Sequence, residues 1–406
     1  MKRLPILIFT VAFALIGSVI ALKSAEAVPA FARQVGVPCF GCHTQHIPLL
    51  NAFGREFKLG GMTQTAQELI EDDGISLPPV ANIGFIMKYR YRKTDPKTEP
   101  TVKTGTDRGT WDLPDEAALW LGGRVAENWG FATEFPGPAA VLKLVYSKDF
   151  GGVQGGLVIY NNDGHGPGSS MELWNSHGVK NHRQFERRWT YTSSVLGGVG
   201  MGNASGVHIF AGADLWFANV GIWVPTPTGG DAGTDFANYF RLAITPAVAE
   251  GLDLMIGVQA SAGSAKAAET LGQPAGVGPI KEFKMGSTRI DFQAMTDVGG
   301  MSLLVVGEYQ VNPHDTKSFY NTGTKDETGL SVSASLGITP MAGLQAAYAT
   351  YSDIDGAASN ADMNATQFGG YYNFAQNIML DLEYTTFGGD ARTLDNELML
   401  MLQVGI

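Results

Sequence analysis

From residue 80 to the C-terminus, apolar and polar side chains alternate along much of the sequence. Aromatic and aliphatic side chains occupy one face of residues 80–92, while Lys88 and Arg90 lie on the other. Residues 252–259 and 378–385 alternate in the same way. Successive side chains of a β-strand point to opposite faces. The pattern therefore predicts half-apolar strands, which suit either a soluble β-sandwich or an outer-membrane barrel whose apolar face contacts lipid.

The lengths of the connections favour the barrel. Short turns, such as residues 246–250 and 340–343, alternate with long loops, such as residues 161–204 and 312–327. Short turns at one end and long loops at the other are typical of outer-membrane barrels. Sixteen strands are predicted to begin near Val80, Glu116, Trp129, Ala139, Gly152, Ser205, Phe217, Phe236, Gly251, Glu282, Met301, Thr328, Leu344, Ala365, Ile378 and Glu397. An even count places both chain ends at the short-turn, periplasmic end.

Residues 79–406 are thus predicted to form a porin-like transmembrane β-barrel of about 16 strands. Aromatic residues close to the short turns are expected to form a girdle at the membrane interface. They are Trp129, Phe150, Trp216, Phe217 and Phe374. Charged residues on the polar faces are expected to line a wet lumen. They are Lys88, Arg90, Arg124, Arg289, Asp291, Glu308, Asp381 and Glu383.

The first residues have the features of a secretory signal peptide. Lys2 and Arg3 precede an apolar stretch over residues 6–22, and small residues end at Ala27. We expect cleavage after Ala27, with an uncleaved membrane anchor as the alternative because such a stretch can just span a bilayer. Export and a barrel together predict the outer membrane of a Gram-negative bacterium.

Cleavage would leave an acidic chain, with 25 basic and 38 acidic residues and a net charge of −13. Such a chain is a poor candidate for binding nucleic acid, because phosphate contacts need clustered lysine and arginine. Its charge is compatible with attracting cations. No Ser-His-Asp, phosphate-binding or paired-carboxylate pattern stands out, so we expect no catalytic side chain beyond a bound cofactor.

The only two cysteines stand in the sequence Cys39-Phe40-Gly41-Cys42-His43. In a C-x-x-C-H motif the two thiols can add to the vinyl groups of haem, and the histidine can reach the iron. The alternatives are a redox-active C-x-x-C pair, or a disulfide followed by a histidine by chance. The motif predicts one covalently bound haem c on Cys39, Cys42 and His43.

Residues 28–78 are predicted to form a small α-helical haem domain, after which residues 76–79 serve as a linker. Pro48 can begin a helix that includes Phe53 and Phe57 and ends at Gly60. A capping-box pattern at residues 65–68 predicts a second short helix through Ile70. So short a segment cannot build a sufficient core alone, so haem or the barrel must complete it.

The second axial ligand of the haem iron has two nearby candidates. Met62 follows the first predicted helix, and methionine ligation would raise the haem potential. His46 is the weaker alternative, because it lies only three residues after His43. His208 on a lumen-facing strand position is a further possible ligand. Residues that suit iron also occur in the long loop, which we expect outside the cell. They are Asp163, His165, Glu172, His177, His182 and Glu186.

Residues 29–62 read PAFARQVGVPCFGCHTQHIPLLNAFGREFKLGGM. The haem motif, preceded by Phe-Ala-Arg-Gln and followed by Phe-Gly-Arg-x-Phe-Lys, resembles the fused cytochrome–porins of iron-oxidising bacteria. In that family a monohaem domain precedes an outer-membrane barrel of about sixteen strands. The matched stretch covers less than a tenth of the chain. It departs from the family at Met62, where tyrosine is expected, and at the terminal Ile406.

The resemblance implies oxidation of extracellular Fe(II), with single electrons passing to a periplasmic cytochrome or a similar acceptor. Taking electrons outside suits a cell because the oxidised iron precipitates near neutral pH. Three alternatives stay open. The chain can serve another external donor or acceptor, it can be a porin with a haem-domain plug, or it can be a soluble periplasmic β-protein.

Overall fold

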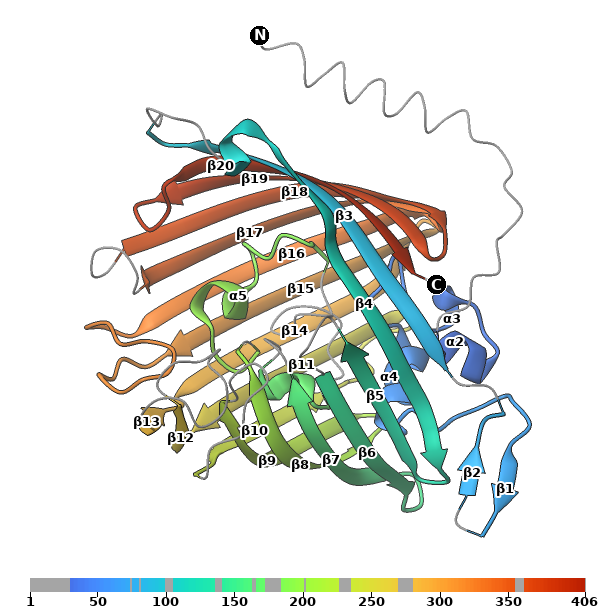
Figure 1. Cartoon of the computed structure of the whole chain (residues 1–406). Coiled ribbons are helices and arrows are strands. Elements are labelled where there is room, and N and C mark those ends of the chain that lie inside the picture. Colours follow the sequence, from blue (N-terminus) through green and yellow to red (C-terminus); the bar gives the residue numbers. More distant parts are fainter. Residues whose placement is uncertain are drawn as a thin grey trace.

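The computed structural model describes residues 30–73, 75–79, 82–98, 105–135, 141–162, 166–171, 184–200, 202–225, 235–268, 280–354 and 361–405. The expected signal peptide and Ile406 lie outside these residues. In this part of the chain, sixteen antiparallel strands form a closed barrel (Figure 1). The final strand pairs with the first barrel strand, with Leu402 opposite Tyr89. The predicted fold class, a mostly β chain with a sixteen-stranded barrel after a small helical region, is confirmed.

The barrel strands follow one another around the wall in chain order. They are β3 (Ile83–Pro96), β4 (Thr110–Ala126), β5 (Trp129–Phe135), β6 (Val141–Asp149), β7 (Gln154–Asn162), β8 (Ala204–Ala213), β9 (Trp216–Pro225), β10 (Ala237–Ile244), β11 (Leu252–Ala262), β14 (Ser287–Val298), β15 (Met301–Asn312), β16 (Glu327–Thr339), β17 (Ala342–Ile354), β18 (Ala361–Ala375), β19 (Ile378–Gly389) and β20 (Leu394–Gly405).

Two predicted strand starts are displaced. The strand expected near Glu116 begins earlier, at Thr110. Glu282 belongs to a separate hairpin of β12 (Ser264–Ala268) and β13 (Ile280–Lys284), and the barrel strand begins later, at Ser287. The hairpin leaves the barrel at Gly263, whose φ of +89° suits glycine, and the amide of Met285 returns to the carbonyl of Gly263. Alternation alone does not distinguish a strand of the wall from a strand of a long loop.

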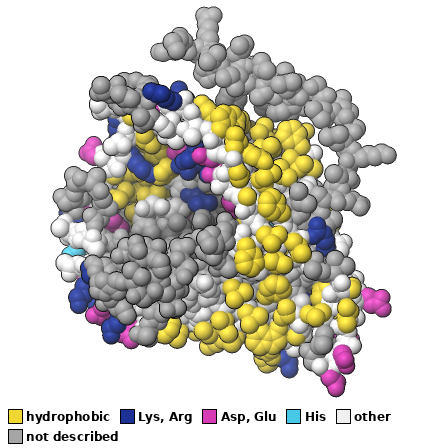
Figure 2. All heavy atoms as spheres, in the orientation of Figure 1, with side chains coloured by type: hydrophobic (Ala, Val, Ile, Leu, Met, Phe, Trp, Pro, Cys, Tyr) yellow, Lys and Arg dark blue, Asp and Glu magenta, His cyan; other side chains and the backbone are white. Residues whose placement is uncertain are grey.

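The outside of the barrel is apolar and the inside is polar, the reverse of a water-soluble protein. Ile209 and Ile290 are 59% and 55% exposed, whereas Gln259 and Arg289 on inward positions are 0% exposed. Figure 2 shows apolar side chains covering much of the visible outer wall. This arrangement matches a barrel whose outer surface lies in hydrocarbon. Among the described residues, no helix has the length and apolarity to cross a bilayer.

The aromatic residues near the short turns do not all face outward. Phe150, Trp216 and Phe374 are exposed, as a girdle requires, but Phe217 is buried. The prediction for Phe217 was wrong because Phe217 and Trp216 are adjacent in β9, so they occupy opposite faces of the wall.

Three short helices precede the barrel. They are α2 (Ala30–Val35), α3 (Cys39–Cys42) and α4 (Ala52–Leu59). Helix α4 begins after Pro48, because the side chain of Asn51 caps it by accepting a hydrogen bond from the amide of Gly54. The second predicted helix is absent from its expected place at residues 65–70. Thr65 instead donates to the carbonyl of Gln34, and the chain continues into a small hairpin.

That hairpin consists of β1 (Ile70–Asp72) and β2 (Ile75–Leu77). The part of the chain before it, residues 30–66, is named here the N-terminal segment. It packs against the inner wall at the end of the barrel where the C-terminus lies (Figure 1). Glycines make room for it: a Cβ on Gly130 would meet the Gly61 carbonyl oxygen at 1.9 Å, and one on Gly123 would meet Gln34 at 2.1 Å.

A second stretch of chain, residues 184–200, also lies inside the barrel and is named the lumen segment. It contains α5 (Thr192–Leu196). Inward side chains of the wall hold its backbone: Gln310 donates to the Gly197 carbonyl at 2.6 Å, and Asn312 donates to the Leu196 carbonyl at 2.7 Å. The prediction that the long loop lies outside the cell is therefore wrong for this part of it.

Candidate cofactor site

A cavity of about 340 Å³ lies where the N-terminal segment meets the barrel wall. Cys39, Cys42 and His43 line it together with both candidate second ligands, Met62 and His46. The opposite lining comes mainly from β3, β4, β19 and β20, the strands on either side of the barrel closure, and Ala132 of β5 and Lys143 of β6 also contribute to it. The volume falls within the range of about 300–1,000 Å³ that is usual for cofactor and ligand pockets.

The backbone around Cys42 holds the motif in shape. Helix α3 is a single turn, and the amide of His43 donates to the Cys39 carbonyl at 2.9 Å. Residues three apart on a helix are neighbours on one face, so both thiols reach the same cavity. Helix α4 packs closely behind, because a Cβ on Gly54 would lie 2.2 Å from the Cys42 carbonyl oxygen. Only glycine allows this approach of the two helices.

His43 is poised as a ligand. Its Nδ1 lies 3.3 Å from the Leu49 carbonyl, a partner that fixes the proton on Nδ1 and leaves the lone pair on Nε2. Burial lowers the pKa of His43 to about 4, so the imidazole is neutral near neutral pH. A metal-binding histidine must be neutral. The residue therefore presents the atom and the protonation state that haem iron requires.

The two thiols differ from a redox-active pair. They are not joined by a disulfide. Burial raises the pKa of Cys39, and burial together with the neighbouring Cys39 raises the pKa of Cys42 to about 11. Thiol–disulfide enzymes instead lower the pKa of one cysteine in C-x-x-C, so that it becomes a nucleophilic thiolate. The environment of Cys39 and Cys42 does not favour that alternative.

Met62 and His46 both line the cavity but differ in their partners. Nδ1 of His46 lies 2.9 Å from the Ile47 carbonyl, and its Nε2 lies 2.9 Å from the side-chain amide of Gln345. Both ring nitrogens are thus engaged by protein groups. Met62 is 5% exposed, and the amide of Gln34 donates to its backbone carbonyl at 2.7 Å. The partners of His46 count against it as the second ligand, while Met62 packs in a buried apolar cluster with Phe57 and Val145.

His208 lies elsewhere in the lumen and does not line the cavity. Its Nε2 lies 3.2 Å from the Tyr160 hydroxyl, its Nδ1 lies 2.7 Å from the Ser170 hydroxyl, and its ring stacks on Tyr239 at 4.8 Å. This histidine has a structural role in the lumen.

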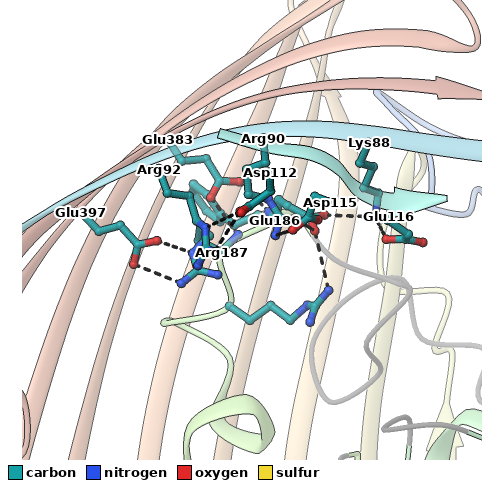
Figure 3. Close-up of polar contacts among 12 residues, drawn as sticks. Lys88, Arg90, Arg92, Asp112, Asp115, Glu116, Glu186, Arg187, Glu383 and Glu397 are labelled. Carbon is teal, nitrogen blue, oxygen red and sulfur yellow. Dashed lines mark hydrogen bonds and ion pairs between the residues drawn. The ribbon is translucent and has the colours of Figure 1, made fainter. Parts of the chain in front are cut away.

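Charged side chains form a strip across the lumen beside the cavity (Figure 3). Lys88 and Arg90 of β3 meet Glu186 of the lumen segment at 3.6 Å and 2.5 Å. Glu383 of β19 accepts hydrogen bonds from the backbone amides of Glu186 and Arg187, at 2.5 Å and 2.8 Å. The strip therefore fastens the lumen segment to strands on both sides of the barrel closure.

The proposed external iron ligands are not gathered by the described part of the structure. Asp163, His165, Glu172, His177 and His182 lie outside the described residues. Glu186 points inward and pairs with Arg90, so it cannot serve an external site. Within the described ranges, no three histidine, cysteine, aspartate or glutamate side chains form a group that suits a metal ion.

Sequence reasoning missed Lys143 and Lys58, which both line the cavity. Lys143 occupies an inward position of β6 between Val141 and Val145. Its place in the alternation was a usable signal, since a lysine on the polar face of a strand points to the lumen. Nothing in the sequence indicated that the cavity would lie opposite β6.

No protein-family model matches the chain, and no curated protein sequence is significantly similar to it. Solved structures are similar in fold at low sequence identity. In-vitro folded OmpT, an outer membrane protein of Vibrio cholerae, is 12% identical with a TM-score of 0.47, over 84% of this chain and 100% of that one. OpdQ of Pseudomonas aeruginosa is 12% identical with a TM-score of 0.45, over 80% and 97%. Such identities are too low to carry an activity to this chain.

Proposed function

We propose that this chain is an outer-membrane electron-transfer protein that carries one covalent haem c on Cys39, Cys42 and His43. We infer that it oxidises extracellular Fe(II) and passes single electrons to a periplasmic cytochrome or similar acceptor. The observation that carries the proposal is the cavity, which is lined by Cys39, Cys42 and His43 together inside a closed barrel.

The residues around the cavity fit a haem by the chemistry of their donor set. Cys39 and Cys42 supply the two thiols for thioether bonds, and His43 supplies the axial nitrogen. The thioether of Met62 would occupy the second axial position. When bound, the haem supplies an Fe(III)/Fe(II) couple that takes up and releases one electron. Apolar side chains such as Phe57 and Leu50 line the cavity and would exclude water from a bound haem.

The evidence for a membrane location is the distribution of side chains on the barrel wall. Its apolar outer face and polar inner face suit lipid outside and a lumen inside. We place the short turns and both chain ends in the periplasm, so that the cavity lies at the end from which a soluble acceptor would approach. The assignment of Fe(II) as the electron donor rests on the resemblance to cytochrome–porins. Oxidation outside the cell would also leave the insoluble ferric product outside.

The test is anaerobic stopped-flow spectroscopy of the oxidised, detergent-solubilised protein mixed with Fe(II) near neutral pH. The proposal expects the reduced α-band to appear rapidly and with the full amplitude that dithionite produces. Reduction by dithionite but not by Fe(II) would overturn iron oxidation while leaving the haem protein standing. Haem-stained denaturing gels of Cys39→Ala and Cys42→Ala test attachment separately, and full retention of haem by both variants would overturn the cofactor.

The barrel alone also suits a solute pore with a haem-domain plug. The N-terminal segment and the lumen segment both occupy the interior, which favours an electron carrier over a wide channel. Conductance in planar bilayers separates the two. A large, steady conductance of the haem-loaded protein would favour the pore.

A further inference from the structure

Among the cations that line the cavity, Lys143 has no acidic partner in the described part of the chain. Its ammonium donates to the carbonyl of Ser169, and no carboxylate of the described residues pairs with it. Lys88 in the same cavity is different, because Glu116 lies 2.7 Å and Glu186 lies 3.6 Å from its Nζ. Lys143 is half-buried, and a cation partly withdrawn from water without a counter-charge is unfavourable, so proteins normally supply an anion.

The surroundings of Lys143 add to this deficit of negative charge. Lys58 on α4 is near enough for the two ammonium groups to repel one another. His208 on β8 also lies near Lys143. The other charged groups that line the cavity are Lys88, Glu116, Glu186 and Asp381. Glu116 and Glu186 are already engaged by Lys88, and the carboxyl group of Asp381 is hydrogen-bonded to Glu383, so none of the three is paired with Lys143.

We propose that Lys143 binds a propionate carboxylate of the haem, with the neighbouring Lys58 adding positive potential. The proposal rests on the proposed function, because haem is the cofactor inferred for this cavity and its two propionates are its only anionic groups. Lys143 reaches the same cavity as Cys39, Cys42 and His43, so one molecule can satisfy the thiols, the imidazole and the ammonium together. A propionate would give Lys143 the counter-ion that the described residues do not provide.

The pairing has two measurable consequences. A cation near the ring favours the reduced haem, so removing it lowers the midpoint potential. Loss of the ion pair also raises the pKa of the buried propionate, so that proton uptake becomes linked to reduction. The potential of the variant therefore depends on pH where the wild type does not.

The test is a spectroelectrochemical titration of the full-length, haem-loaded protein in detergent between pH 5 and 8. We expect Lys143→Gln to lower the ratio of reduced to oxidised haem about tenfold at a fixed ambient potential. Such a change is about 59 mV for a one-electron couple. Lys143→Arg should restore most of the potential. Lys148→Gln, on an exposed position of the same strand, is the matched control and should behave as wild type.

The possible outcomes separate the role of Lys143 from the presence of the haem. Wild-type potential and pH dependence in Lys143→Gln, with the covalent haem band intact, would overturn the role of Lys143 while sparing the haem protein. Absence of covalent haem from the wild type would instead overturn the proposed function. If Lys143→Gln does not fold, resonance Raman spectroscopy of Lys143→Arg provides the second measurement. An unshifted propionate-bending mode in that variant would contradict the pairing, and a shifted mode would support it.

Discussion

Two histidines three positions apart have different tasks because their hydrogen-bond partners differ. The Leu49 carbonyl holds the proton of His43 on Nδ1, which leaves the lone pair on Nε2, and His43 lines the cavity. Gln345 and the Ile47 carbonyl engage both nitrogens of His46. From the sequence, the two histidines could be ranked as candidate iron ligands only by their positions along the chain. Their chemistry is set by their partners.

The second axial ligand is testable by substitution of cavity methionines. We expect Met62→Ala to give a high-spin haem spectrum and a lower midpoint potential, because a thioether ligand raises the potential. Met401→Ala is the matched control, since Met401 is 1% exposed and lines the same cavity. Both variants should lose about 2–5 kcal/mol of stability. A normal spectrum in Met62→Ala and an altered one in Met401→Ala would assign the ligand to Met401.

At the scale of single residues, the sequence identified the local motif and missed its distant partners. Cys39, Cys42 and His43 were recognisable because the haem motif is contiguous, and their haem role stays a prediction. Lys143 could not be assigned to the cavity from the sequence, because about 100 residues separate it from the motif. The same holds for Gln345, whose contact with His46 spans 299 positions.

Among the elements, the barrel strands and the helix that became α4 were predictable from the sequence, whereas the second predicted helix was wrong. A strand of a two-faced wall is marked by its own alternation, so its existence can be read locally. The capping box at residues 65–68 failed because the Thr65 hydroxyl bonds to the Gln34 carbonyl, 31 residues away. A tertiary contact thus took the group that would have started the helix.

The lumen segment is held by Glu383, which suggests a variant that releases it. We expect Glu383→Ala to remove the acceptor for the amides of Glu186 and Arg187, at a cost of about 1.5–3 kcal/mol for each charged hydrogen bond. Arg187 and Arg188 should then be cleaved by trypsin at least tenfold faster, and conductance in planar bilayers should rise. Asp395→Asn, an exposed carboxylate on the adjacent strand, is the control. Equal cleavage rates in Glu383→Ala and wild type would contradict this role.

For the whole molecule, the sequence predicted the closed barrel and the even strand count but not what fills the barrel. The alternation of apolar and polar residues and the lengths of the loops give information only about each strand and the strands next to it. The placement of the N-terminal segment depends on small residues in the wall, such as Gly123 and Gly130, whose significance appears only when the sheet has closed. An isolated glycine in a strand has several possible meanings.

The apolar outer wall predicts how the protein responds to charge. Val332 lies near the middle of β16 and is 47% exposed on the outside. We expect Val332→Lys to destabilise the barrel in lipid vesicles by about 2–4 kcal/mol, as lysine does at the bilayer midplane. Val248→Lys is the control, because Val248 is 57% exposed in a short turn. Urea unfolding measures both, and equal stabilities of the two variants would contradict a membrane position for β16.

The cavity draws its lining from the first and last barrel strands, with Lys88 on β3 and Met401 on β20 facing the same space. These strands are joined to each other only when the two ends of the sheet meet. Contacts so distant in sequence form slowly during folding. The complete lining of the cavity therefore exists only after the barrel has closed, so a native environment there reports closure of the whole sheet.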